Sequence, residues 1–403
     1  MLPKKEALLN LEDVINKSWH LYQEKGVVGY DPSVLFKSLK FYRAYEEKQS
    51  LVNKVLYTTE LGMLYLLPSM EWYLDKVNAQ KVKNNYGLSF FIQAFGKMFQ
   101  YYGNEQFLDE AKKLAASVTA ELIATPNGLG MANPPNLNEH LNGVAYTENV
   151  ALIPSTAEFV FALLELFSIS KDENYLDIAR KIAKSFARDY SHKFYGSKIS
   201  IDYSTAGDNT HILNANALAI ACICLVNKII GSNSENDLIH GVYAYLKDYL
   251  DSIQIPYCGK EDSANNKNWK DCDVYHTGFT LRGAEIISDY LKDDEMTGKI
   301  KKIRQEFFPY FLNGKKEIVK MKNSAVIDIH GVAEYILYYS MHHNELPENY
   351  LEIVIQNINK TFDGQTFLYR KIYEKKVKCY MPRWGHAPMM NAISSLMLAL
   401  KTS

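Results

Sequence analysis

The sequence lacks several patterns that identify common classes of enzyme. It contains no glycine-rich phosphate loop, no HExxH pair and no GxSxG turn, so it offers no support for P-loop, zincin or hydrolase-elbow chemistry. Its five cysteines are odd in number and form no CxxC pair, which argues against a zinc cage and fits a reducing compartment. We therefore expect neither a metal ion nor a cofactor.

An excess of charge of one sign is also missing. The formal net charge is −1, so the chain lacks the basic character expected of a nucleic-acid binder. No charge-free apolar run approaches the length that crosses a bilayer. The first residues include Glu6, Glu12 and Asp13 and no small-residue cleavage site, so they do not read as a signal peptide. We expect a cytosolic protein without nucleic-acid partners or stable membrane insertion.

The chain does contain an internal repeat. Residues 104–115 recur as residues 172–183, about 68 positions further on, and residues 348–353 form a third, shorter copy of the repeat. The pattern of each copy predicts an amphipathic helix. In the helix predicted from the second copy, Tyr175 and Phe186 lie on one apolar stripe. Because the amphipathic helix of each copy follows a more apolar helix, the repeating unit is a helical hairpin.

Six apolar inner helices are predicted, and their starts are spaced roughly 52 to 66 residues apart, enough for two helices and two loops. We predict an all-α fold, an (α/α)6 toroid forming one domain over residues 1–403, with residues 1–85 as an N-terminal helical extension that helps to close the ring. An open solenoid is the competing arrangement. Strand signals are few, and a short hairpin or irregular loop is expected over residues 194–203. The predicted starts lie near Leu88, Pro154, Ile212, His276, Asp328 and Pro382.

The inner helices of such a toroid run parallel, so their N-termini gather at one mouth. Free backbone N–H groups and helix dipoles collect there and favour an anionic ligand. Four of the ten histidines fall at these starts: His211, His276, His330 and His386. Histidine titrates near neutrality and can transfer protons to and from a substrate. The structural alternative is that such residues only cap their helices.

The densest polar segment at the mouth is residues 271–279. Asp273, Tyr275 and His276 place a carboxylate, a phenol and an imidazole within one helical turn. At the last start, Arg383 suits a carboxylate and Trp384 suits a sugar face, whereas the alternative pairs Arg383 with an acid inside the ring. The remaining polar candidates near the starts are Tyr146, Glu148 and Asn214.

Three of these starts resemble a known group. Residues 275–279, 214–218 and 383–384 are similar to bacterial surface-polysaccharide biosynthesis proteins of the six-hairpin glycosidase-like superfamily, over roughly residues 85–403. The resemblance implies an (α/α)6 toroid. It also implies one of several activities, since the superfamily includes glycoside hydrolases, uronate-specific lyases, unsaturated glucuronyl hydrolases and sugar epimerases.

The leading hypothesis is a carbohydrate-active enzyme of bacterial surface-polysaccharide metabolism that acts on a uronate-containing or otherwise anionic oligosaccharide or polysaccharide, by lyase or C5-epimerase chemistry. His276 and Tyr275 are the predicted base and acid, with Asp273 and His211 as further catalytic candidates. The predicted substrate-binding residues are Arg383, Trp384, Asn214, His330, His386, Tyr146 and Glu148.

Three alternatives remain open at this point. One is a glycoside hydrolase with paired carboxylates, for which Glu148 with Asp273 or Asp328 is available. Another is a non-catalytic glycan-binding component of capsule assembly. A prenyl or terpenoid-processing toroid is disfavoured, because the start at residues 208–216 is rich in amides rather than aromatic.

Overall fold

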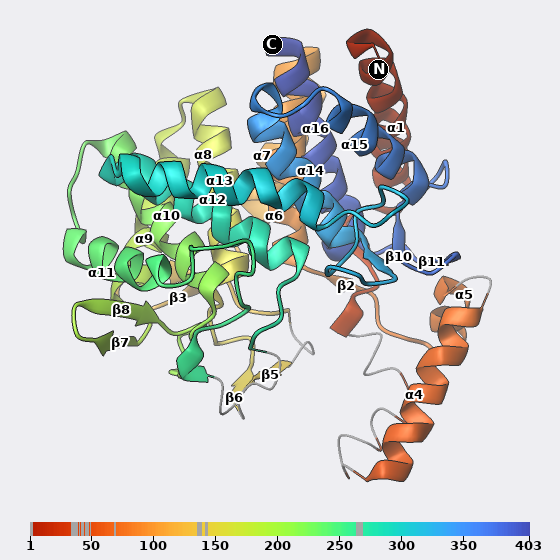
Figure 1. The fold of residues 1–403 in the computed structure, drawn as a ribbon, viewed down its shortest axis with the longest axis horizontal. Coiled ribbons are helices and arrows are strands. Elements are labelled where there is room, and N and C mark those ends of the chain that lie inside the picture. The colour runs from red at the N-terminus through yellow and green to blue at the C-terminus, as the bar shows by residue number, and fades with distance from the viewer. Residues whose placement is uncertain are drawn as a thin grey trace.

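The structure of the chain is a computed structural model. It describes residues 3–33, 39, 41, 44, 48, 50–67, 70–134, 139–141, 144–262 and 269–403. Six inner helices in this described part form a ring (Figure 1). They are α6 (Asn85–Tyr102), α8 (Ile153–Ser170), α10 (Leu213–Ile230), α12 (Val274–Leu291), α14 (Ile329–His342) and α16 (Ala387–Thr402).

The ring is closed. Each inner helix contacts the next, and α16 contacts α6. Each inner helix also packs against an outer partner. In chain order these partners are α7 (Glu105–Thr119), α9 (Glu173–Arg188), α11 (Asn236–Lys247), α13 (Asp294–Tyr310) and α15 (Asn349–Thr361), while α1 (Lys4–Lys25) packs against α16. The predicted (α/α)6 toroid is confirmed, since an open solenoid has no contact between its first and last units.

The repeated outer helices form for local reasons. Asn104 and Asp172 cap α7 and α9, each accepting a hydrogen bond of 3.0 Å from a backbone N–H two residues later. On α9, Leu176, Ile182 and Phe186 are buried against the inner helices. The inner helices are buried on most sides because they lie between their outer partners and one another.

Short strands lead into the inner helices. The described pairs are β1 (Val28–Gly29) with β2 (Val82–Lys83), β3 (Ile123–Ala124) with β4 (Leu129–Gly130), β5 (Glu139–Leu141) with β6 (Val144–Tyr146), and β7 (His192–Tyr195) with β8 (Lys198–Ile201). A three-stranded sheet holds β9 (Val326–Asp328), β10 (Leu368–Ile372) and β11 (Lys375–Lys378) in the order β11-β10-β9. All are antiparallel. The β7–β8 hairpin confirms the strand signal near residues 194–203.

Short helical turns complete the described elements. Two are 3₁₀ turns, Lys260–Asp262 and His343–Glu345, and a π-helical turn, Pro382–His386, precedes α16. In Figure 1 both chain termini lie at one side of the ring and strands β5 to β8 lie at the other. The first turns of the inner helices therefore open on the strand side, which we call the mouth.

Helices α8 and α10 are strongly apolar, although each contains at least one charged residue. Each is 18 residues long and apolar enough, by length and composition, to cross a membrane. Both pack against other helices of the ring, and most of their residues are buried there. Apolar composition on all sides is also what a core helix needs, so these two helices are weak evidence for a membrane span.

Helices α4 (Leu51–Leu66) and α5 (Met70–Lys76) extend away from the ring beside β11 (Figure 1). A second apolar cluster, which includes Tyr30, Met70 and Val377, joins them to the mouth side of the ring. The sequence patterns left residues 30–82 unplaced. The structure attaches the described part of this segment through β11.

Candidate functional site

Five rings gather at the mouth from four different inner-helix starts. They are Tyr86 of α6, Tyr275 and His276 of α12, His330 of α14, and Trp384 of the turn before α16, and we call them the mouth cluster. The Tyr275 ring lies 3.9 Å from His276, 5.2 Å from His330 and 5.9 Å from Trp384, between ring centres. Residues far apart in sequence therefore build one surface.

His276 is held by Asp273, the cap residue of its own helix. One carboxylate oxygen of Asp273 accepts the backbone N–H of His276 at 2.9 Å, and the other accepts Nδ1–H at 2.6 Å. Burial raises the Asp273 pKa, but the charge and hydrogen bonds of His276 outweigh burial, so the pKa lies below its usual value. The ionised carboxylate thus fixes the ring with Nε2 as its free nitrogen.

His330 is held differently. Its Nδ1–H donates to the backbone carbonyl of Trp384 at 3.3 Å, and the two rings stack 4.9 Å apart. Burial lowers the pKa of His330 to about 4. At neutral pH the ring is therefore uncharged, and because Nδ1 carries the proton, Nε2 is a hydrogen-bond acceptor.

Four polar atoms of the mouth cluster have no hydrogen-bond partner among the described residues. They are Nε2 of His276, Nε2 of His330, and the hydroxyls of Tyr86 and Tyr275. Burial raises the pKa of both phenols, so both stay protonated and act as donors. The cluster presents two nitrogens and two hydroxyls to a ligand from a largely aromatic surface, an arrangement that suits a sugar.

No protein-family model and no curated protein sequence matches the chain. Solved structures do match its fold. A sugar epimerase from a ruminal bacterium aligns at 12% identity with a TM-score of 0.59, covering 80% of this chain and 88% of that chain. Cellobiose 2-epimerase from Spirochaeta thermophila DSM 6192 aligns at 12% identity with a TM-score of 0.59, covering 79% and 86%.

A glycoside hydrolase matches as well. The α-1,6-mannanase GH76A of Salegentibacter sp. HEL1_6, an inactive variant in complex with α-1,6-mannotriose, aligns at 14% identity with a TM-score of 0.58, covering 80% and 92%. The chain has the six-hairpin toroid fold. At these identities the likeness establishes the fold that the chain shares with epimerases and mannanases.

Arg383 is engaged within the protein. Its guanidinium makes two hydrogen bonds to the buried carboxylate of Asp31, one of them 2.7 Å long. This is the intramolecular alternative left open by the sequence. Asp31 neutralises the Arg383 charge, and the role of Arg383 in holding a substrate carboxylate stays a prediction.

Trp384 is fixed at the edge of the mouth cluster. Its Nε1–H donates to Asp328 at 2.8 Å, and Arg370 donates to the other Asp328 oxygen at 2.8 Å. Asp328 also caps α14 through the backbone N–H of His330. Trp384 thus keeps one ring orientation, with its polar atom satisfied inside the protein.

Three other predicted candidates lie in the segments that precede α8 and α10. Tyr146 is buried and donates to Asp208 at 2.9 Å. His211 is buried beside Ser200, 2.6 Å from its hydroxyl. Glu148 lies in an exposed turn before α8. The structure does not bring these three residues into the mouth cluster.

Asn214 lies in the first turn of α10, at the mouth end of that helix. Helices α10 and α12 run side by side with Ala217 packed on Gly283, so Asn214 lies one turn nearer the mouth, level with the turn that holds Phe279. Its Oδ1 is buried without a hydrogen-bond partner among the described residues. A buried acceptor of this kind is available to a ligand.

His386 lies outside the mouth cluster. Its Nε2–H donates to the carbonyl of Ser18 on α1 at 3.0 Å, and its ring packs near Phe91, Phe367 and Tyr380. Burial lowers the His386 pKa to about 4. The residue predicted to bind substrate therefore joins α1 to the last inner helix.

Sequence reasoning missed a buried ionic triad beneath the cluster. Arg282 of α12 donates to Glu158 of α8 at 2.7 Å and to Glu334 of α14 at 3.2 Å. Gly278 allows this close packing of α12 against Glu334, because a Cβ at Gly278 would lie 2.6 Å from Glu334. The available signal was one charged residue within an apolar stretch of each of three helices, since a buried charge needs a partner.

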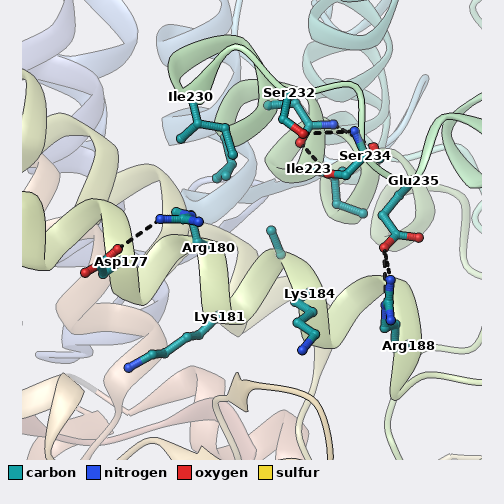
Figure 2. Close-up of a pocket in the computed structure, with 13 residues that line it drawn as sticks. Asp177, Arg180, Lys181, Lys184, Arg188, Ile223, Ile230, Ser232, Ser234 and Glu235 are labelled. Atoms are coloured by element: carbon teal, nitrogen blue, oxygen red, sulfur yellow. Dashed lines mark hydrogen bonds and ion pairs between the residues drawn. The ribbon is translucent and has the colours of Figure 1, made fainter.

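A surface cavity of about 570 Å³ lies elsewhere, between α9 and the C-terminal half of α10. Figure 2 shows Arg180 directed at Asp177 and Arg188 directed at Glu235 on its wall. These carboxylates already pair with the two guanidiniums. The cavity is at the end of α10 opposite the mouth and contains no residue of the mouth cluster. Among the described residues, no group of three or more His, Cys, Asp or Glu can hold a metal ion.

Proposed function

We propose that the chain is a sugar epimerase or aldose–ketose isomerase, which moves a proton at the carbon next to a sugar carbonyl. One observation carries the proposal: His276 and His330, on neighbouring inner helices, are each fixed through Nδ1 and each present Nε2 beside Tyr275. Imidazole is well suited to such proton transfer near neutral pH. The epimerases of the same fold support this choice.

In the proposed reaction, Nε2 of His276 removes the proton from the carbon next to the carbonyl of the open-chain sugar. The C–H electron pair forms the double bond of an enediolate, and the carbonyl oxygen becomes negatively charged. Tyr86 and Tyr275 donate hydrogen bonds to that oxygen, because their phenols stay protonated. Asp273 stabilises the positive charge that forms on His276.

The product depends on where the proton returns. Its return from His276 to the former carbonyl carbon, together with passage of the neighbouring hydroxyl proton to the former carbonyl oxygen, yields the ketose. Alternatively, His330 takes up a proton from the solvent beside the negative enediolate and delivers it to the opposite face of the original carbon. This re-forms the carbonyl and yields the epimer, while the proton held by His276 returns to the solvent. Because burial lowers its pKa to about 4, His330 is neutral near pH 7, and it takes up this proton only beside the negative intermediate.

Hydrolysis by paired carboxylates is less well supported. The inactive mannanase carries substitutions at two adjacent aspartates, and adjacent aspartates occur once in this chain, as Asp293 and Asp294. They begin the outer helix α13, where Asp293 pairs with Lys247. At the mouth, Asp273 and Asp328 are both occupied by protein donors.

The proposed substrate is a neutral reducing sugar or oligosaccharide. The anionic substrate predicted from the sequence relied on Arg383, whose charge is paired with Asp31. Trp384 and Tyr275 provide aromatic faces for a sugar ring, and Asn214 offers an acceptor for a hydroxyl. A place in surface-polysaccharide metabolism remains a prediction.

The test is hydrogen exchange from sugars in D₂O. The protein is incubated with reducing monosaccharides, disaccharides and uronic acids, and loss of the C2 proton signal is followed by NMR along with new sugar products. Exchange is expected for wild type and absent for His276→Gln. His240→Gln, a change at an exposed histidine of α11, is the matched control and keeps full exchange.

The outcomes separate the candidate activities. If His276→Gln exchanged the C2 proton at the wild-type rate, His276 would not be the base of the reaction. Cleavage of glycosidic bonds without exchange would identify a hydrolase instead. Exchange confined to uronic acids would restore the anionic substrate. For His330→Gln, we expect exchange and ketose to persist while the epimer is lost.

A further inference from the structure

Helix α4 exposes an unusual amount of apolar surface. It projects from the ring (Figure 1), and Leu51, Val52, Val55, Leu56 and Met63 are 78%, 67%, 55%, 37% and 61% exposed. Together they expose on the order of 500 Å² of apolar surface, as much as the largest patch on a typical monomer. An exposed patch of this size on one helix marks an interaction surface.

The opposite side of α4 faces its own chain. Asn53 donates to the carbonyls of Ala44 and Lys48, both at 2.9 Å, and Glu60 accepts the backbone N–H of Phe41 at 2.9 Å. Tyr57 and Leu61 pack against the second apolar cluster. The exposed apolar side is therefore a distinct face, separated from the one that anchors the helix.

The exposed side has the spacing of a coiled-coil seam. Val52, Leu56, Thr59 and Met63 follow one another at intervals of four, three and four residues, which keeps them on one line facing another helix. Thr59 fits such a seam, because its hydroxyl already donates to the carbonyl of Val55 at 2.9 Å. Its methyl group is left for packing.

The charge pattern favours a second copy of this chain over a membrane. The only charged residues of α4 are Lys54 and Glu60, and neither lies in the seam, so two α4 helices meet without repulsion. A helix that lies on a membrane surface has a polar face rich in Lys and Arg. The other face of α4 instead packs against its own chain.

We propose that α4 is a dimerisation helix that pairs antiparallel with α4 of a second copy through the seam of Val52, Leu56, Thr59 and Met63. The end of α4 that does not lead into α5 lies away from the ring (Figure 1), so antiparallel pairing keeps the two rings at opposite ends. Such pairing buries on the order of 1,000 Å² in total, enough for a specific interface.

The test is the mass of the full chain in solution, measured by light scattering during size-exclusion chromatography at micromolar concentration. Wild type is expected at twice the 46.2 kDa of one chain. Leu56→Glu places a charge in the seam and is expected at the mass of one chain. Thr58→Glu adds the same charge on α4 outside the seam and is the matched control, expected to remain a dimer. Circular dichroism establishes that both variants are folded.

Cross-linking tests the antiparallel arrangement. Chains carrying Val52→Cys are mixed with chains carrying Met63→Cys and oxidised, and a mixed disulfide dimer is expected. Disulfides only between two Val52→Cys chains would mean parallel pairing and overturn the arrangement. A monomeric wild type, a dimer that persists in Leu56→Glu, or a monomer that sediments with phosphatidylglycerol vesicles would overturn the proposal itself.

Discussion

Asp273 performs two tasks with one carboxylate. One oxygen caps α12 through the backbone of His276, and the other holds Nδ1 of the same residue. A cap and a histidine partner are separable by substitution, because asparagine caps a helix as well as aspartate does but carries no charge. Replacing Asp273 by asparagine therefore tests the proposed base directly.

For Asp273→Asn we expect the exchange rate from sugars to fall about 100-fold or more, with KM little changed. The cause is loss of the charge that stabilises the protonated ring and fixes its orientation. The melting temperature should stay close to that of wild type, since the cap is kept. Rates are measured by the same exchange in D₂O.

Asp172→Asn makes the same substitution at the cap of the outer helix α9 and is the control, with unchanged exchange. Equal rates for Asp273→Asn and wild type would mean that Asp273 is only a cap. If the fall in kcat were accompanied by a lower melting temperature, the substitution would have damaged the helix, and Asp273 would not be shown to position His276.

Residue types at the mouth were predictable from the sequence, but their partners were not. The start of α12 was found because Asp273, Tyr275 and His276 lie within one turn of each other. Asp31, which occupies Arg383, is separated from it by 352 positions. No local pattern connects such a pair, because ring closure alone brings the two residues together.

The triad of Arg282, Glu158 and Glu334 connects α12 to α8 and α14 beneath the mouth. One cation faces two carboxylates, so the triad is one charge short of balance. Burial raises the pKa of Glu334 to about 8, and Arg282 only partly offsets that shift. Glu334 is therefore protonated at neutral pH in the folded protein.

This protonation makes stability depend on pH. Above its ordinary pKa Glu334 is ionised in the unfolded chain and protonated in the fold, so its contribution to stability falls as pH rises from about 4.5 to about 8. We expect Glu334→Gln to lose this part of the pH dependence and to exceed wild type in stability at pH 8. Urea unfolding across this range measures the difference.

Glu158→Gln is the matched comparison within the triad. It removes the carboxylate that makes the shorter contact with Arg282, and the expected cost is about 1–3 kcal/mol at neutral pH, because a buried charge loses a partner. If the two variants had the same pH dependence, the two glutamates would share the proton equally.

At the scale of elements, the sequence predicted the outer helices best. Residues 104–115 and 172–183 carry their caps and apolar stripes locally, and both became the outer helices α7 and α9. The triad was missed for the opposite reason. Its members are charged residues within apolar stretches of three inner helices, and their pairing depends on the rotation of the three helices about their axes.

At the scale of the whole molecule, the last inner helix lacks an outer helix that follows it in sequence, and α1 occupies that position. Trp19 of α1 lies 5.0 Å from Phe95 of α6 and 5.1 Å from Phe107 of α7, between ring centres. Tyr22 donates to Glu110 of α7 at 2.5 Å. The start of the chain thus packs against the first hairpin as well as the last.

Trp19→Ala is therefore expected to destabilise the whole ring rather than α1 alone. The indole is buried between α1 and the first hairpin, and its removal is expected to cost about 3–5 kcal/mol. His20→Ala, at the neighbouring exposed position of α1, should cost within about 0.5 kcal/mol. Urea unfolding followed by circular dichroism and by tyrosine fluorescence should give one coincident transition for each variant. A separate early transition in Trp19→Ala would mean that the ring stays folded without α1, and that its closure rests on the contact between α16 and α6.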